Sequence, residues 1–491
     1  MAKTHSILFV SSEIYPFAKE SGIGDFTYSF SLAIRDLGHD IRIMVPKYGS
    51  VSERKNRIHE INRLRDIPIP MGSGHEPATV KSSSVNNPRS KVQAYITTNF
   101  NYFDSKKGIY RDPRTGKEYS DNPERFIFFS RSVVETCMLL GWYPDIIHCN
   151  GWQTAIIPAY IKAAFPSKFK KTKSVFTVHN FQDNVICPEK VFNKAGLPDK
   201  AMKKFLDDGK YNFIKGGIEF ADYVTTLSPA YAEEVYSDEA ASGGLDGFLK
   251  NNSKKFAGIR CGIDTWGWNP VKDKIIPGNY DSDFDEYKYT NKVELCNKFG
   301  IEYHPKIMII GMAASLSDDN GIDLLLEAAP EILKDENIKI VFLGKGDPEL
   351  KKQMTKTAKK FPDQFKIKYA TDDELAHLIF AGSDAYAMPS KYEGGGLDLM
   401  YALTYGTIPI VRNTGAIKEI AENINESNNE GNAFVFEEYR AEEFAEAVNK
   451  AVKLFSDKDA WEEVARTGMS GDYSWQKWAL RYEEIYKSIT K

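Results

Sequence analysis

The sequence lacks a long uninterrupted run of hydrophobic residues. No apolar segment approaches the length of about 18 residues at which a run becomes a candidate membrane-spanning helix. The first residues, MAKTHSILFVSSEIYPF, hold a short apolar run that is too brief for the hydrophobic part of a signal peptide and is typical of a first strand. We therefore expect no membrane span or secretory leader, and the simplest expected location is the cytoplasm.

Cysteine is also scarce, with five residues in a chain of 491. None of them forms a C-x-x-C pair, and no His/Cys cluster with zinc-ligand spacing is present. Reduced thiols are the simplest interpretation, and no metal or other cofactor is predicted. The scattered cysteines are Cys137, Cys149, Cys187, Cys261 and Cys296.

An excess of charge of one sign is missing as well. The formal net charge of −4 gives no support for general binding to nucleic acid or to a membrane surface. Aromatic residues are plentiful, at 13% of the chain. Such a content suits a surface that handles carbohydrate, but a well-packed aromatic core gives the same content.

What the chain does contain is a repeated alternation of short apolar runs and helical patterns, which predicts an α/β fold with parallel sheets. The alternation starts with SILFVSS, IRIMVP and DIIHCN, and it restarts in the second half with KIMIIGMA, IKIVFLG and DAYAMPS. A length of 491 residues exceeds one ordinary core. We expect two doubly wound halves, with a ligand cleft between the carboxyl ends of their sheets.

A polar stretch rich in Asp, Pro, Gly and Trp, at about 262–289, is interpreted as the crossing between the halves. The predicted domains are residues 1–262 and 263–470, followed by an amphipathic aromatic helix over 471–491.

The segment FAKESGIGDF follows the first predicted strand. Gly22 and Gly24 allow a ligand to approach the backbone, Lys19 supplies a positive charge, and Asp25 is predicted to cap the next helix. Glycine-bearing loops of this kind are also common as simple tight turns.

The segment KIMIIGMAASLSDDNGIDLLLEAAPEIL is typical of a strand, a loop and a helix. A strand that leads into a helix N-terminus often binds phosphate, because free backbone N–H groups and the helix dipole attract an anion. This loop, however, carries Asp318 and Asp319 and no basic residue.

Many collinear motifs resemble the bacterial glycogen synthase and plant starch synthase family. They include SSEIYPFAK, DIIHCNGWQTAIIPAY, FTVHN, KGGIEFAD, LGKGDPEL, ELAHLIFAGSDAYAMPSKYE and YALTYGTIPIVRNTGAIKE, and they extend from about Ile7 to the last helix. The resemblance implies a GT-B fold, with an acceptor-side first domain, a nucleotide-donor second domain and a last helix that crosses back to the first. It also implies transfer of glucose from ADP-glucose to an α-1,4-glucan with retention of configuration and without a metal.

The same resemblance implies which residues form the site. His179 matches the position that approaches the donor sugar, and Glu393 matches the glutamate that faces it, so these two are the implied catalytic residues. The remaining implied donor-binding positions are Lys19, Gly22, Gly24, Asp25, Gly396, Leu397, Arg412, Thr414 and Gly415.

Simpler roles exist for several of these side chains. His179 is also consistent with a hydrogen-bonded core histidine, and Arg412 with an ion-pair partner. Glu393 also suits a carboxylate placed beside a helix N-terminus.

Several positions depart from the family pattern, and most of them concern the donor. Ser315 and Asn320 stand where the family has the arginine and the lysine that neutralise the donor diphosphate. Thr371 replaces the aromatic residue that packs on adenine. Gly151 stands where the family has a carboxylate, and the other departures are Ser21, Cys261 and Leu399.

Three functions therefore remain open: a glucosyltransferase that still elongates α-glucan, a non-catalytic relative that binds glucan or another enzyme of glycogen metabolism, and a transferase with a different sugar-nucleotide donor. The loss of one preorganised charge stabiliser typically costs a factor of about 10²–10³ in rate. The absence of both phosphate cations therefore makes transfer from ADP-glucose doubtful.

Overall fold

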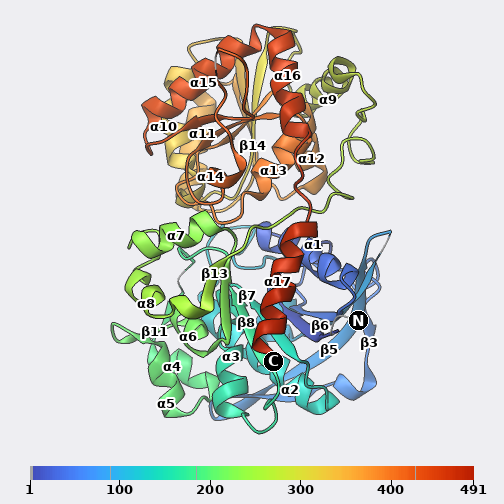
Figure 1. Cartoon of the computed structure of the whole chain (residues 1–491), viewed down its shortest axis with the longest axis vertical. Helices are drawn as coiled ribbons and strands as arrows, with labels where there is room; N and C mark the ends of the chain where they lie inside the picture. The colour runs from blue at the N-terminus through green and yellow to red at the C-terminus, as the bar shows by residue number, and fades with distance from the viewer. Residues whose placement is uncertain (1–3, 89, 184, 426) are drawn as a thin grey trace. The chain divides into compact units, whose positions relative to one another are not determined.

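The computed structural model describes residues 4–88, 90–183, 185–425 and 427–491. The chain forms two compact units (Figure 1). Unit 1 contains Met1–Gly262 together with Trp475–Lys491, and unit 2 contains Ile263–Ser474. Within the described residues, no helix is both long enough and apolar enough to cross a membrane.

Unit 1 is built on a ten-stranded sheet in the order β13-β12-β8-β7-β1-β2-β6-β5-β3, with β4 paired to β5. All neighbours from β13 to β6 are parallel, whereas the pairs at the β3 edge are antiparallel. The strands are β1 (Ser6–Val10), β2 (Asp40–Pro46), β3 (His59–Glu60), β4 (Ile67–Met71), β5 (Gly74–Asn86), β6 (Lys91–Thr98), β7 (Ile146–Asn150), β8 (Lys173–Thr177), β12 (Tyr223–Thr226) and β13 (Phe256–Gly258). A separate small sheet contains β9 (Ile186–Cys187), β10 (Leu206–Asp207) and β11 (Lys210–Asn212).

The helices of unit 1 include those between its strands and the last helix of the chain. They are α1 (Gly22–Asp36), α2 (Asn122–Leu140), α3 (Ile157–Ala159), α4 (Glu189–Phe192), α5 (Asp199–Met202), α6 (Phe213–Phe220), α7 (Pro229–Ser237), α8 (Asp246–Asn251) and α17 (Gln476–Ile489). The N-terminus of α1 corrects one prediction. Ser21, rather than Asp25, caps this helix, because Gly22 and Gly24 are themselves helical and Ser21 Oγ accepts a hydrogen bond from the Ile23 N–H.

Helix α17, at the end of the chain, packs against α1. Trp475 just before it and Tyr482 within it contact the ring of Phe30. The hydroxyl of Tyr486 lies 2.7 Å from Nδ1 of His148, which is buried in β7. These contacts fix the last helix to the core of unit 1.

Unit 2 is a six-stranded parallel sheet in the order β16-β15-β14-β17-β18-β19, with helices on both sides (Figure 1). The strands are β14 (Met308–Ala313), β15 (Ile338–Leu343), β16 (Phe365–Lys368), β17 (Ala385–Met388), β18 (Ile408–Arg412) and β19 (Phe434–Phe436). The helices are α9 (Phe284–Phe299), α10 (Ile322–Ile332), α11 (Pro348–Lys360), α12 (Asp373–Gly382), α13 (Leu397–Thr404), α14 (Ile417–Ile420), α15 (Ala441–Phe455) and α16 (Lys458–Met469). Helix α9 begins inside the stretch interpreted as a crossing, because Asp283 caps it and accepts from the Glu286 N–H.

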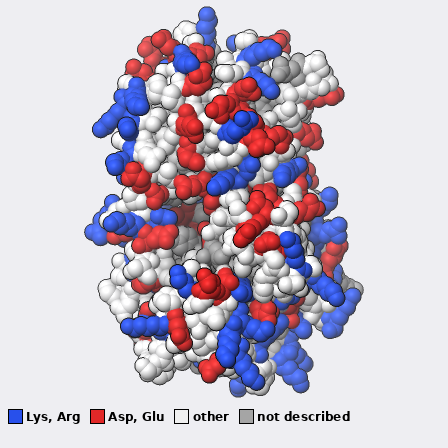
Figure 2. Space-filling view, turned by 90° about the vertical axis from the view of Figure 1, so that its left-hand side faces the viewer, with Lys and Arg blue, Asp and Glu red and all other residues white. Residues whose placement is uncertain are grey.

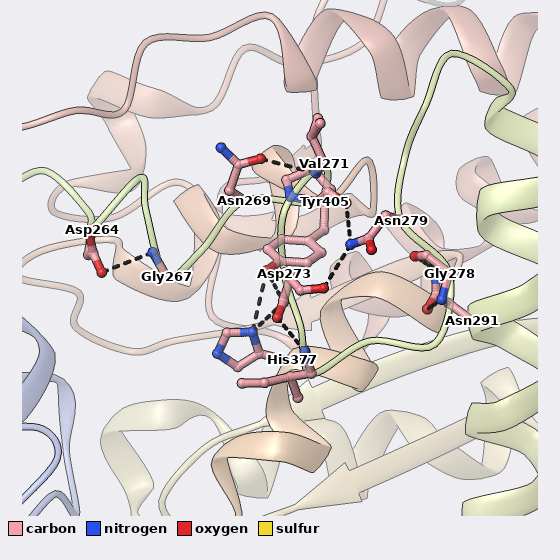
Figure 3. Close-up of polar contacts among 12 residues, drawn as sticks. Asp264, Gly267, Asn269, Val271, Asp273, Gly278, Asn279, Asn291, His377 and Tyr405 are labelled. Atoms are coloured by element: carbon pink, nitrogen blue, oxygen red, sulfur yellow. Dashed lines mark hydrogen bonds and ion pairs between the residues drawn. The ribbon is translucent and has the colours of Figure 1, made fainter. Parts of the chain in front are cut away.

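The polar stretch before α9 is anchored to unit 2 by a buried cluster (Figure 3). Asp273 Oδ2 lies 2.6 Å from Nδ1 of His377 and accepts a hydrogen bond of 2.5 Å from the hydroxyl of Tyr405. Trp268 stacks between the rings of His377 and Tyr401. Burial alone would raise the pKa of Asp273, but the hydrogen bond and the charge interaction with His377 bring this pKa below its ordinary value. The ELAH and YALTYG motifs thus serve the fold.

Charged side chains of both signs are interspersed over much of the face shown in Figure 2, and basic side chains gather toward the lower end of unit 1. This mixture agrees with the small net charge of −4.

Candidate functional site

The carboxyl edge of the unit 1 sheet brings three predicted segments together. Strand β1 lies between β2 and β7, so the sheet extends from β1 to one side through β2 and to the other side through β7. In open parallel sheets, ligands bind at such a switch point, outside the carboxyl ends of the strands. The segments that follow β1, β7 and β8 contain residues 11–25, 151–154 and 178–183.

The loop after β1 is held by a buried carboxylate, Glu13, whose role no motif of the sequence indicated. Glu13 Oε2 accepts from the backbone N–H groups of Glu20 and Ser21, and Oε1 accepts from the hydroxyls of Ser21 and Tyr110. Burial raises the pKa of Glu13 from 4.5 to about 7, although these donors act in the opposite direction. The sequence signal was a charged residue three positions after the end of a buried strand.

This loop presents an ion pair. Lys19 Nζ lies 2.9 Å from Asp25 Oδ2, and both side chains are largely buried. A Cβ atom on Gly24 would lie 3.0 Å from Cγ of Lys19, so the glycine lets the lysine stem cross close to the first turn of α1. Gly22 is exposed at the start of that turn.

His179 follows β8, is buried, and contacts the uncharged side chains of Asn150 and Phe26. Its Nε2 atom lies 3.2 Å from the side-chain oxygen of Asn150, and its ring meets Phe26 edge to face. Burial lowers the pKa of His179 to about 3. A neutral imidazole can exchange hydrogen bonds with a sugar hydroxyl, but at neutral pH it does not serve as a general acid.

The position of the family carboxylate, Gly151, has a backbone that only glycine adopts readily, with φ 68° and ψ 167°. A Cβ atom there would overlap Oε1 of Gln153. The departure at this position therefore involves the backbone and a neighbouring side chain as well as a missing carboxylate.

The carboxyl edge of the unit 2 sheet has the same architecture. Strand β14 lies between β15 and β17, so the strand order again turns at the first strand of the unit. The loops after β14 and β17 touch, because the Lys391 N–H donates to the Asp319 carbonyl at 2.8 Å. The loop after β18 joins them, since the Ala416 N–H donates to the Glu393 carbonyl at 2.9 Å.

The loop after β14 uses its polar groups internally. Asn320 Nδ2 donates to the Ser315 carbonyl at 2.9 Å and to Ser317 Oγ at 3.0 Å. Asp318 and Asp319 lie in a short 3₁₀ turn that ends at Asn320, and Gly321 leads into α10. The strand, loop and helix predicted here are present, but neither Ser315 nor Asn320 brings a positive charge to the loop.

Glu393, after β17, is half-buried and folds back on its own loop. Its Oε1 atom accepts from the N–H groups of Gly395 and Gly396, at 3.2 and 2.8 Å. Burial raises the pKa of Glu393, while these two donors act in the opposite direction. Gly396 is the N-cap of α13, and Leu397 is the first residue of this helix. Leu399 is buried in its first turn.

Arg412, at the end of β18, is directed at backbone carbonyls. Its guanidinium donates to the Ser390 carbonyl at 2.9 Å and to the Lys391 carbonyl. Thr414 is buried, and Gly415, with φ 47°, lies where a Cβ atom would overlap the Glu393 carbonyl. This joining of two loops is a role that neither donor binding nor an ion pair, the two roles expected for Arg412, describes.

The other two departures lie apart from these loops in the sequence. Cys261 is buried in unit 1, and burial of this kind suits a small packed thiol. Thr371 is exposed just before α12 in unit 2. Among the residues that the structure describes, no three His, Cys, Asp or Glu side chains are grouped so that they could hold a metal ion.

The structure thus brings Lys19, Asp25 and His179 to segments at one edge of unit 1, and Glu393 and Arg412 to the corresponding edge of unit 2. Sequence reasoning missed Glu13 and Gln153 in unit 1. A polar residue three positions after the end of a buried strand was the available signal for both positions.

Comparison with known proteins gives the same assignment over the whole chain. The family model for the starch synthase catalytic domain matches residues 6–251, and the model for group 1 glycosyl transferases matches residues 298–467. Glycogen synthase from Chlorobaculum parvum is 35% identical over 491 residues, covering 99% of both chains. Glycogen synthase from Geotalea daltonii is 36% identical over 487 residues, covering 98% of both chains.

Solved structures agree. The catalytic domain of starch synthase IV from Arabidopsis thaliana, bound to ADP and acarbose, has a TM-score of 0.90 and 26% identity and covers 99% of this chain and 100% of its own. Sucrose-phosphate synthase from Thermosynechococcus elongatus, at 14% identity and a TM-score of 0.60, shares the fold. The predicted GT-B fold with two Rossmann-like domains is confirmed.

Proposed function

Because the chain belongs to the bacterial glycogen synthase and plant starch synthase family of glycosyltransferases, we propose that it acts in α-1,4-glucan synthesis as a glucan-binding member with weak or absent transfer from ADP-glucose. The glucan is the neutral sugar ligand of unit 1. The departures that concern the diphosphate of the donor lie at the edge of unit 2.

One observation carries the proposal: the loop Ser315–Gly321 offers no cation to a diphosphate. Asn320 bonds back to the Ser315 carbonyl and to Ser317, and two aspartates follow Ser317. Developing charge on a leaving nucleotide diphosphate needs preorganised cations, since this stabilisation is usually the largest catalytic contribution. A carboxylate pair beside the helix N-terminus disfavours such an anion.

The residues proposed to handle the sugar itself are retained. His179 and the Lys19–Asp25 pair occupy the unit 1 edge, and Glu393 with the Gly396–Leu397 backbone occupies the unit 2 edge. The relative bound to ADP and acarbose shows that starch synthase IV takes both a nucleotide and an oligosaccharide-like ligand. For this chain we propose that the oligosaccharide is bound and that the nucleotide is held weakly.

The test is a pair of measurements on the purified full chain. Calorimetry with maltoheptaose is expected to show binding, and radiolabelled ADP-glucose with glycogen is expected to give little or no incorporation. Turnover at about 10 s⁻¹, a typical enzyme value, would contradict the proposal. Absence of any binding to maltoheptaose would contradict its glucan-binding part.

A second candidate is a transferase with another sugar-nucleotide donor. It is favoured by the exposed Lys391, whose backbone N–H contacts the loop carbonyl of Asp319 and which places a positive charge beside that loop. A calorimetric screen of nucleotide sugars, with and without Mg²⁺, tests it. Silence across the whole screen would remove this candidate, whereas binding that Lys391→Met weakens would support it.

A further inference from the structure

Gln153 has an unsatisfied polar group in the interior of unit 1. It lies in the short 3₁₀ turn Trp152–Thr154 that follows β7, and only 2% of the residue is exposed. In the described part of the chain, its buried carboxamide oxygen has no hydrogen-bond partner. Buried polar groups in native proteins nearly always have partners, so an exception at the carboxyl edge of a sheet points to a group that a ligand completes.

The oxygen is directed at the side of Gly151 that lacks a side chain. A Cβ atom on Gly151 would overlap Gln153 Oε1 and would lie 3.7 Å from Cδ1 of Ile23 in the first turn of α1. The oxygen therefore lies at the switch point of the sheet, between the end of β7 and the start of α1.

Neighbouring donors are already used. The Gly151 N–H donates to the Thr177 carbonyl, and the Ile23 N–H donates to Ser21 Oγ. The side-chain amide of Asn150 donates to the Val10 carbonyl. None of these groups can satisfy Gln153 without breaking an existing hydrogen bond.

The chemical class of the missing partner follows from the uncharged side chains at this edge of the sheet. A carboxamide oxygen needs an O–H or N–H donor, and it has no net charge with which to hold an ion. Burial keeps His179 neutral, and Asn150 is an uncharged amide. A hydroxyl group of a sugar is a neutral donor of this kind, whereas a phosphate oxygen at neutral pH is mainly an acceptor.

We propose that Gln153 is a specificity-determining residue, whose carboxamide oxygen accepts a hydrogen bond from a hydroxyl group of a glucose unit bound at the carboxyl edge of unit 1. This inference rests on the proposed function and names a contact within it. The glucose unit belongs either to the end of an α-1,4-glucan or to the sugar of a nucleotide donor, and the same hydroxyl chemistry serves both.

The experiment replaces Gln153 by methionine, which has similar length and no hydrogen-bonding oxygen. Maltoheptaose and ADP-glucose are titrated separately into the wild-type chain and into Gln153→Met. We expect the variant to bind one of the two sugars about tenfold more weakly, the effect of losing one buried hydrogen bond. A loss with maltoheptaose assigns the contact to the glucan, and a loss with ADP-glucose assigns it to the donor sugar.

Thermal unfolding separates this role from a structural one. Because Gln153→Met removes a polar group that lacks a partner, its melting temperature is expected to equal or exceed that of the wild type. The matched control is Gln364→Met in unit 2, since Gln364 Nε2 donates to the carbonyls of Leu333, Asp335 and Ile338. The control is expected to melt earlier and to bind the sugars unchanged.

Two results would overturn the inference. If the wild type binds either sugar and Gln153→Met binds both with unchanged affinity, the oxygen is completed by a buried water and the proposed function stands. If the wild type binds neither sugar, the inference and the proposed function fall together.

Discussion

The carboxyl edges of the two sheets share an architecture and differ in how their polar groups are used. In unit 1, Lys19 and Asp25 form an ion pair beside α1, and the oxygen of Gln153 has no hydrogen-bond partner among the residues that the structure describes. In unit 2, Asn320 and Arg412 make hydrogen bonds to the backbone of their own loops. The two edges therefore share a backbone architecture, while the side chains of the unit 2 edge form hydrogen bonds within the protein.

The largest expected effect concerns the buried carboxylate beneath the unit 1 edge. The pKa of Glu13 is raised from 4.5 to about 7, so between these values the folded chain binds more protons than the unfolded chain. Stability from this group is fully present below pH 4.5 and is lost as pH rises through 7. At 1.36 kcal/mol per pKa unit the change is about 3 kcal/mol.

Urea unfolding of the wild type and of Glu13→Gln at several pH values measures this effect. The difference in unfolding free energy between the two proteins is expected to vary over pH 4.5–7 and to be constant above about pH 8. A difference that does not vary with pH would show that Glu13 stays ionised in the folded chain.

The next effect tests whether the unit 1 departure involves the backbone. Gly151→Asp restores the family residue type, but the backbone at φ 68° and ψ 167° resists any side chain, and Cβ would overlap Gln153. We expect a loss of about 2 kcal/mol of unfolding free energy. Gly151→Ala should lose a similar amount, because strain and overlap begin at Cβ. A fully stable Gly151→Asp would mean that this loop can adopt the family conformation.

Arg412→Met tests whether Arg412 in unit 2 serves the protein backbone or an anion. The guanidinium joins the loop after β17 to β18 through the Ser390 and Lys391 carbonyls. Its removal is expected to lower the unfolding free energy by about 1 kcal/mol, in the range for hydrogen bonds that are partly exposed. Phosphate binding, followed by calorimetry, should not change. A clear loss of phosphate affinity would show that the guanidinium serves an anion.

The smallest effect is expected for Asn320→Ala. This change removes two hydrogen bonds inside a half-exposed loop and should cost roughly 0.5–1 kcal/mol, measured by thermal unfolding. Lys352→Ala, on the exposed surface of α11, serves as the control and should be close to neutral, because its ion pair with Glu349 is solvent-exposed. A cost above about 2 kcal/mol for Asn320→Ala would mean that the loop is part of the core of unit 2.

Much of the fold could be predicted from the sequence, because strands such as SILFV and IRIMV are continuous apolar runs between helical patterns. The antiparallel edge could not, since β5 reads GHEPATVKSSSVN and lacks that signal. The cap of α1 was wrongly assigned to Asp25, because the sequence does not show that two glycines join a helix.

The candidate site was predictable to the level of loops. Glu393 and His179 follow strands whose carboxyl ends meet at the predicted edges. The role of Gln153 was not predictable, because it depends on the φ angle of Gly151 and on which neighbouring donors are already used. The same limit applies to Asn320, whose amide is directed inward by the local turn.

The central claim is that the donor edge of unit 2 holds a diphosphate weakly because Ser315 and Asn320 bring no cation to it. Calorimetric titration of ADP into the wild type and into Ser315→Arg/Asn320→Lys tests it most directly. The double variant is expected to bind ADP at least tenfold more tightly, since charge-assisted hydrogen bonds to phosphate contribute about 1.5–3 kcal/mol each. Equal affinity of the two proteins, or tight binding of ADP by the wild type, would contradict the claim.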